Sequence, residues 1–197
     1  MTPLDSLPQD IRDNYEVHEW RHACAVLEND FPEEWRDLIQ VLSAFELRRS
    51  YIAKGGGNLS PVSRWFEQAF GKRGWDERKF DTKIVVDRDS IDSPTHKVDC
   101  FKNGIALEIE WNNKDPFFDR DLNNFRLLFE LRIAHVGIIV TRCDELQAIF
   151  DSLGRRTSFG ESTTHISKLL PKLDGGGGGG CPVLVFGIRG SLYRSDL

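Results

Sequence analysis

The sequence predicts an α/β protein built on a mixed central β-sheet with helices on both faces. Two apolar runs, Val136–Thr141 and Val183–Phe186, lack polar alternation, which is typical of strands buried on both faces. The pair Asn103-Gly104 lies between two β-type runs, and Asn-Gly is a strong short-range signal for a β-hairpin. Segments with helical periodicity lie around these runs and would cover the sheet.

The N-terminal part predicts two amphipathic helices, at residues 14–30 and 32–49. Asp30 can cap the second helix, and Pro32 suits its first turn. Apolar residues then follow at helical spacing and predict one buried stripe, part of which could instead face a second subunit: Trp35, Leu38, Ile39, Leu42 and Phe45.

A glycine-rich stretch, Lys54–Asn58, precedes a third predicted helix. It lacks the Gly-Lys-Ser/Thr ending of a phosphate-binding P-loop, so a flexible connector is the favoured interpretation, with a backbone contact to DNA left open. Ser60 should then cap a helix that has Pro61 at its first position and runs to about Gly71.

The later elements follow the same logic. Phe80–Val86 predicts a strand, and the polar segment Asp87–Thr95 predicts a loop, since it contains a proline that cannot donate to a ladder. A helix is expected at about residues 119–133, and the chain should turn helical again from Arg142. The six glycines Gly175–Gly180 predict a mobile loop between a helix and the last buried strand.

Length and composition favour one domain over residues 1–197, with a helical part at 1–58 and the core at 59–197. The net charge of −5 does not indicate nucleic-acid binding, although a local basic cleft can coexist with an acidic body. The 4 cysteines are scattered without a Cys-x-x-Cys pair, so structural zinc is not expected and a reducing cytoplasm is the expected location. We expect no signal peptide, and no run approaches the about 18 apolar residues of a membrane span.

The predicted hairpin concentrates acidic residues. Glu108 and Glu110 are two positions apart on one strand, so their side chains point to the same face, and Asp99 lies across the hairpin. Carboxylates placed together repel each other, and a divalent cation would neutralise them. The alternative is a solvated strand face that carries two glutamates for solubility.

Leu107, Ile109 and Trp111 alternate with these acids, and the run continues into Asn112-Asn113-Lys114-Asp115. This arrangement resembles the active site of the PD-(D/E)xK nucleases, with Glu110 in place of the usual lysine. That variant is similar to the BglII/BstYI/BamHI group of type II restriction endonucleases. The order of the later elements fits the same group, over about residues 55–190.

The resemblance implies a restriction-endonuclease-like core and Mg²⁺-dependent cleavage of double-stranded DNA at a short palindrome by a homodimer, and it suggests a GATC-centred site. Asp99 and Glu108 would bind the metal, with the backbone carbonyl of Ile109 as a further ligand, and Mn²⁺ is expected to substitute. Glu110 would orient or deprotonate the attacking water, or bind a second cation. Glu67 would be either a fourth acid of the site or an ordinary surface glutamate. A separate DNA methyltransferase is an expected partner, and a membrane is not.

Two groups of residues are candidates for DNA contacts. Asn112, Asn113 and Lys114 follow the catalytic strand and could pair with base edges, or they could simply form the turn before Pro116. The second group lies in residues 154–165, where arginine and hydroxyl side chains suit phosphates and bases: Arg155, Arg156, Ser158 and Thr163. The alternative for that segment is an exposed loop with a helix cap at Ser162 or Thr163.

Two other functions stay open from the sequence. One is a nuclease of the same fold that acts on modified or structured nucleic acid. The other is a non-catalytic DNA-binding relative, against which the three intact acids argue. Digestion of a defined plasmid with Mg²⁺ and with EDTA would separate them.

Overall fold

The structure is a computed structural model that describes residues 3–53 and 59–196. Its centre is a six-stranded mixed sheet, as the sequence predicts. The three inner strands run parallel, and antiparallel strands flank them on both sides. In spatial order the strands are β1 (Tyr15–Trp20), β9 (Val183–Ile188), β8 (Val136–Arg142), β7 (Ile105–Ile109), β6 (Val98–Lys102) and β3 (Asp76–Arg78).

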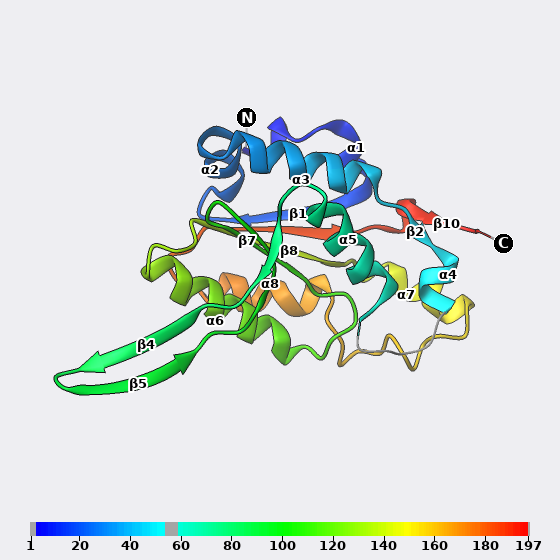
Figure 1. Ribbon diagram of the computed structural model, residues 1–197. Helices are drawn as coiled ribbons and strands as arrows, with labels where there is room; N and C mark the ends of the chain where they lie inside the picture. Colours follow the sequence, from blue (N-terminus) through cyan, green and yellow to red (C-terminus); the bar gives the residue numbers. More distant parts are fainter. Residues whose placement is uncertain (1–2, 54–58, 197) are drawn as a thin grey trace.

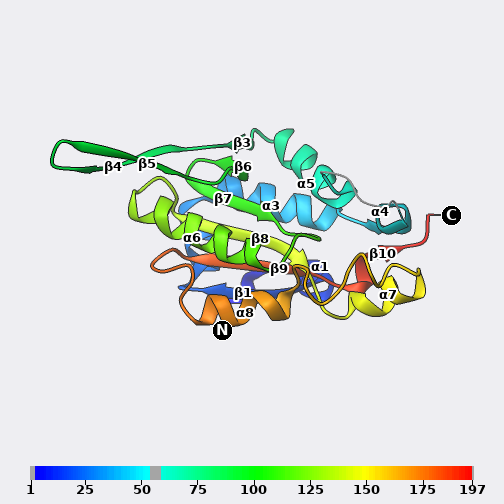
Figure 2. The same cartoon turned by 90° about the horizontal axis from the view of Figure 1, so that it is seen from below.

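Helices cover both faces of this sheet (Figures 1 and 2). One face carries α1 (Gln9–Asn14), α2 (Ala23–Asp30), α3 (Pro32–Ala44) and α5 (Pro61–Gly71). The other face carries α6 (Pro116–Glu130) and α8 (Ile166–Asp174). Apart from a separate hairpin described below, the remaining elements are η1 (Pro3–Ser6), β2 (Leu47–Arg48), α4 (Arg49–Ala53), α7 (Leu146–Ser152), η2 (Gly190–Leu192) and β10 (Tyr193–Arg194).

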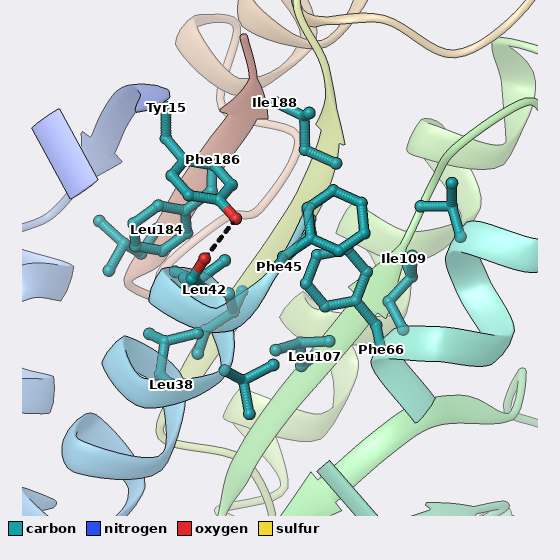
Figure 3. Packing of buried hydrophobic residues seen from close by; sticks show 14 of the residues in the cluster. Tyr15, Leu38, Leu42, Phe45, Phe66, Leu107, Ile109, Leu184, Phe186 and Ile188 are labelled. Carbon is teal, nitrogen blue, oxygen red and sulfur yellow. Dashed lines mark hydrogen bonds between the residues drawn. The ribbon is translucent and has the colours of Figure 1, made fainter. Parts of the chain in front are cut away.

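The sheet separates two hydrophobic cores, and alternate residues of each inner strand enter one or the other. Leu107 and Phe186 belong to the core under α3 and α5, where Tyr15 donates a hydrogen bond of 2.8 Å to the Leu42 carbonyl (Figure 3). Ala106 belongs to the core under α6 and α8. Because side chains alternate along β7, Glu108 shares the face of Ala106 and lies on the side of the sheet that α6 covers.

The predicted helix at residues 14–30 is wrong in its first half. Tyr15–Trp20 is strand β1, which pairs antiparallel with β9 from Tyr15↔Ile188 to Trp20↔Val183. Arg21 and His22 then have φ values of 57° and 56°, so the chain turns before α2 begins. The open edge of β9 supplies backbone partners to this segment, and long-range pairing of this kind overrides local helical pattern.

The second predicted helix exists but is shorter. α3 ends at Ala44 instead of residue 49, and its N-cap residue is Phe31, without a side-chain cap from Asp30. Pro32 does occupy the first turn. The cap of α5 is confirmed, since the Ser63 N–H donates a hydrogen bond of 2.9 Å to Ser60 Oγ. The glycine-rich connector at 54–58 lies outside the described residues.

The loop predicted for Asp87–Thr95 is also wrong. Asp89–Pro94 is strand β5, which pairs with β4 (Asp81–Val86) in a separate two-stranded sheet. This hairpin extends away from the body of the molecule (Figures 1 and 2). Pro94 pairs only at the end of the ladder, opposite Asp81, where a missing N–H is tolerated.

The glycine run connects α8 to β9, as predicted, and contacts define its path. The Gly179 carbonyl accepts hydrogen bonds from Trp20 Nε1 at 3.3 Å and from Arg21 Nε at 3.1 Å. A Cβ at Gly179 would lie 2.7 Å from Cγ of Arg126 on α6. Close packing against α6 therefore requires glycine here, and the run belongs to the folded body. Within the described residues, no helix is both long and apolar enough to cross a membrane.

Candidate active site

The acids lie where strands β6 and β7 separate. The hairpin turn is confirmed, with φ values of 45° at Asn103 and 85° at Gly104, and backbone pairing extends to Cys100↔Leu107. Beyond that pair, side chains replace the ladder: the Ile109 N–H donates to Asp99 Oδ2 at 2.9 Å, and the Asp99 N–H donates to Glu108 Oε2 at 3.3 Å. The strands can therefore part without leaving these amides unpaired.

An irregularity in β6 accompanies this separation. Asp76 pairs with Phe101 and Arg78 with Val98, so β6 has one more residue than β3 across the same distance. A β-bulge of this kind bends a strand and re-aims its side chains, and bulges are common beside active sites. In this structure the extra residue falls in the segment that contains Asp99.

Glu108 and Glu110 are buried, with 0% and 1% of their surface exposed, so the alternative of a solvated strand face is wrong. Burial raises the pKa of Glu108 well above its ordinary value, and the charges of Asp121 and Asp99 raise it further. Burial, followed by the charge of Asp121, raises the pKa of Glu110 to about 9. The pKa of Asp99 is raised as well, chiefly by burial. The charged forms of these buried acids therefore lower the stability of the folded protein unless a cation neutralises them.

Asp121 is a fourth acid that the sequence did not single out. It lies on α6, is fully buried, and faces the same side of the sheet as Glu108 and Glu110. Burial raises its pKa to about 6, although the charge of Arg120 opposes the shift. The sequence held a signal for it, because Asp121 occupies the inward stripe of the helix together with Phe118, Leu122 and Phe125.

Arg120 is a second residue that the sequence did not assign to the site. Its Nη2 lies 3.2 Å from Glu110 Oε1 and 2.7 Å from Asp121 Oδ1, and its Nε lies 2.9 Å from the same Asp121 oxygen. The guanidinium carbon lies 4.2 Å from the ring centroid of Phe117, one turn earlier on α6. Arg120 thus supplies one positive charge to a cluster that contains four acidic side chains: Asp99, Glu108, Glu110 and Asp121.

Two oxygens of this cluster have no hydrogen-bond partner among the described residues. They are Glu108 Oε1 and Asp121 Oδ2, both buried. Buried polar atoms are normally paired, and hard divalent cations such as Mg²⁺ prefer carboxylate oxygens as ligands. The cluster therefore fits a divalent cation in its chemistry. Within the described part of the chain, no three His, Cys, Asp or Glu side chains already stand in a ready metal-binding geometry.

The cluster opens into a cleft of about 800 Å³. Asp99, Glu110 and Arg120 line it, whereas Glu108 and Asp121 lie behind its wall. Glu67 on α5 also lines the cleft, and burial together with the charge of Asp99 raises the pKa of Glu67. This position, beside Asp99, differs from that of an ordinary surface glutamate.

The structure brings the two predicted groups of DNA-contacting residues together. Lys114 forms an antiparallel backbone bridge with Thr163, and the Thr164 N–H donates to the Asn113 carbonyl at 2.8 Å. Asn113 Nδ2 also donates to Glu110 Oε2 at 2.8 Å. Of the predicted residues, those that line the cleft are Asn112, Asn113, Arg155 and Ser158, whereas Lys114, Arg156 and Thr163 are not among its lining residues.

Thr163 has a role within the fold. Its hydroxyl accepts a hydrogen bond of 2.7 Å from Arg142 Nη2 and donates one of 2.7 Å to the Gly160 carbonyl. Arg142 itself is buried, at the end of β8. The expected helix cap at Ser162 or Thr163 is absent, because α8 begins after His165, which makes no side-chain cap. Arg142 and Thr163 together hold the loop that presents Arg155 and Ser158 to the cleft.

A mixed sheet whose inner hairpin delivers buried acids to the wall of a polar cleft defines a restriction-endonuclease-like α/β protein. The family model described as Restriction endonuclease BglII/BglIII matches residues 15–188, and the chain belongs to this family. The match runs from the first residue of β1 to the last residue of β9, so it covers more of the N-terminal part than the resemblance at 55–190 indicated. No curated protein matches the chain. Membership makes the protein a DNA-cleaving enzyme of type II, whose substrate is DNA.

Proposed function

We propose that this protein is a Mg²⁺-dependent type II restriction endonuclease that cuts double-stranded DNA at a short palindrome as a homodimer. The observation that carries the proposal is the buried acid cluster at the parting of β6 and β7, with two unpartnered carboxylate oxygens behind the cleft wall. Family membership supports the reaction class, and the resemblance to the BglII/BstYI/BamHI group suggests a GATC-centred site.

In this proposal Asp99 and Glu108 hold the cation, with the carbonyl of Ile109 as a further ligand. The bound cation would lower the pKa of the attacking water and offset charge on the scissile phosphate. Asp99 is already fixed for this role by the Ile109 N–H, and Glu108 by the Asp99 N–H. These two bonds orient the carboxylates before any ligand arrives, which lowers the cost of ordering them.

Glu110 would act as the general base. Its carboxylate lines the cleft and is held from two sides, by Asn113 Nδ2 and by Arg120 Nη2. Burial beside Asp121 raises the pKa of Glu110 to about 9, so Glu110 holds a proton in the metal-free protein. It would act as a base only once a bound cation favours its ionised form.

The test is digestion of a supercoiled plasmid of known sequence with Mg²⁺, with Mn²⁺ and with EDTA. We expect discrete fragments with either metal and none with EDTA. Glu108→Gln should abolish cleavage, and Glu110→Gln should slow it by about 10²- to 10⁴-fold. Glu33→Gln, an exposed glutamate on α3, is the matched control and should cut at the wild-type rate.

Cleavage in EDTA, or a Glu108→Gln variant that cuts normally, would overturn the assignment of the site. A smear instead of discrete fragments would favour a nuclease that acts on modified or structured DNA. Sequencing the fragment ends would give the recognition sequence and test whether it contains GATC.

A further inference from the structure

The guanidinium of Arg120 is a partly exposed cation held against carboxylates that are almost fully buried. The Arg120 side chain is 29% exposed, whereas the side chains of Glu110 and Asp121 are 2% and 0% exposed. Arg120 also lines both the main cleft and a smaller cavity of about 360 Å³ beside it. It therefore lies at the boundary between the acid cluster and the space where DNA would bind.

The charge balance around Arg120 is unequal. Among the described residues, it is the one lysine or arginine that forms an ion pair with any of the acids Asp99, Glu108, Glu110 and Asp121. Two carboxylate oxygens of this cluster stay without a hydrogen bond even so. A divalent cation would neutralise the cluster more completely than one guanidinium, and its charge would repel Arg120 from Glu110.

The surroundings of Arg120 favour a second position for its head group. Phe117 lines the cleft and is 36% exposed, and its ring packs against the guanidinium. A guanidinium is a fork of donors that matches a phosphate as well as it matches a carboxylate. A movement about the side-chain torsions of Arg120 would carry those donors from the acids into the cleft.

We propose that Arg120 is an exchangeable counter-ion, which is paired with Asp121 and Glu110 in the metal-free protein and transfers its guanidinium to a DNA phosphate when a divalent cation binds the acid cluster. The inference rests on the proposed function, because it requires a cation at that cluster. It makes Arg120 the residue that couples the two ligands, so that each tightens the binding of the other.

The experiment measures binding, without turnover. Ca²⁺ is titrated into the DNA-free protein by calorimetry, and binding of a mixed-sequence duplex is measured with Ca²⁺ and with EDTA at several salt concentrations. The variant is Arg120→Gln. Arg126→Gln is the matched control, since Arg126 lies on the same helix, carries the same charge, and contacts Asn123 on the surface.

In the DNA-free protein, Arg120→Gln should bind Ca²⁺ about tenfold more tightly, because the competing charge is gone. With EDTA its affinity for the duplex should match the wild type, because Arg120 is then held by the carboxylates. With Ca²⁺ the duplex should bind about tenfold more weakly than it binds the wild type, and the salt slope should fall by about 0.9, as expected for one lost phosphate contact. Arg126→Gln should change none of these values.

Two results would contradict the exchange. Equal Ca²⁺ affinity and equal coupling in Arg120→Gln and wild type would overturn the exchange while leaving the metal site intact. A wild-type protein that binds no Ca²⁺ would overturn both the exchange and the proposed function. If Arg120→Gln does not fold, Arg120→Lys takes its place, because lysine keeps the positive charge but lacks the paired N–H donors of the guanidinium. The exchange then predicts that Ca²⁺ strengthens DNA binding less in Arg120→Lys than in the wild type. An equal strengthening in the two proteins overturns the exchange.

Discussion

The metal-free protein should lose stability as the pH rises, and Glu110→Gln should remove the share of that loss that belongs to Glu110, while the raised pKa of Glu108 leaves a share of its own. The pKa of Glu110 is raised from its ordinary value of 4.5 to about 9, first by burial and then by the charge of Asp121. The folded protein therefore keeps a proton on Glu110 that the unfolded chain releases. The stability associated with that proton is fully present below pH 4.5 and is lost as the pH rises towards 9.

The size of the effect follows from proton linkage. One proton bound in the folded state alone changes the free energy of unfolding by about 1.4 kcal/mol per pH unit, or about 3 kcal/mol from pH 6 to pH 8. For a chain of this length that corresponds to a fall of roughly 6–12 °C in the unfolding midpoint. Asp121 has a pKa of about 6, so its own contribution is largely lost below this window.

Thermal unfolding in EDTA at pH 6, 7 and 8 measures the slope directly. The wild-type midpoint should fall across the series, and the Glu110→Gln midpoint should fall less, by the share of one proton, with Glu33→Gln following the wild type. Parallel curves for wild type and Glu110→Gln would refute the reasoning, because they would mean that Glu110 carries the same charge in the folded and unfolded states.

Three further predictions concern recognition, packing and assembly. Asn113→Ala should weaken binding to the cognate duplex by about 1–3 kcal/mol more than binding to a scrambled one, whereas Arg155→Ala should weaken both and lower the salt slope; equal losses for the two duplexes would leave Asn113 as a turn residue that supports Glu110. Gly137→Ala should lower the free energy of unfolding by about 1–3 kcal/mol, measured by denaturant titration, since a Cβ there would overlap the ring of Phe125; an unchanged midpoint would show that Phe125 can move. Light scattering should give a mass near twice 22.5 kDa in the presence of DNA, and a monomer that only nicks would contradict the proposed dimer.

Local sequence determined the elements whose signals lie within a few residues. The Asn103-Gly104 turn follows from backbone preference, and the period-2 pattern of β7 places Glu108 and Glu110 on one face. The buried strand β8 and the Ser60 cap of α5 were predictable for the same reason. These features depend on neighbouring residues, so one sequence is enough to define them.

Only the tertiary structure decided the features that depend on distant partners. Tyr15–Trp20 became a strand because β9, far along the chain, offers an open edge. Asp121 and Arg120 joined the site because α6 crosses the face of the sheet that carries the glutamates, and nothing in their own sequence neighbourhood fixes that packing. The cleft likewise depends on the bridge between Lys114 and Thr163, which brings together two segments that the sequence presents about 50 residues apart. Side-chain periodicity thus defined which face of β7 is acidic. Long-range packing decided how deeply those acids are buried and that the guanidinium of Arg120 lies against Glu110.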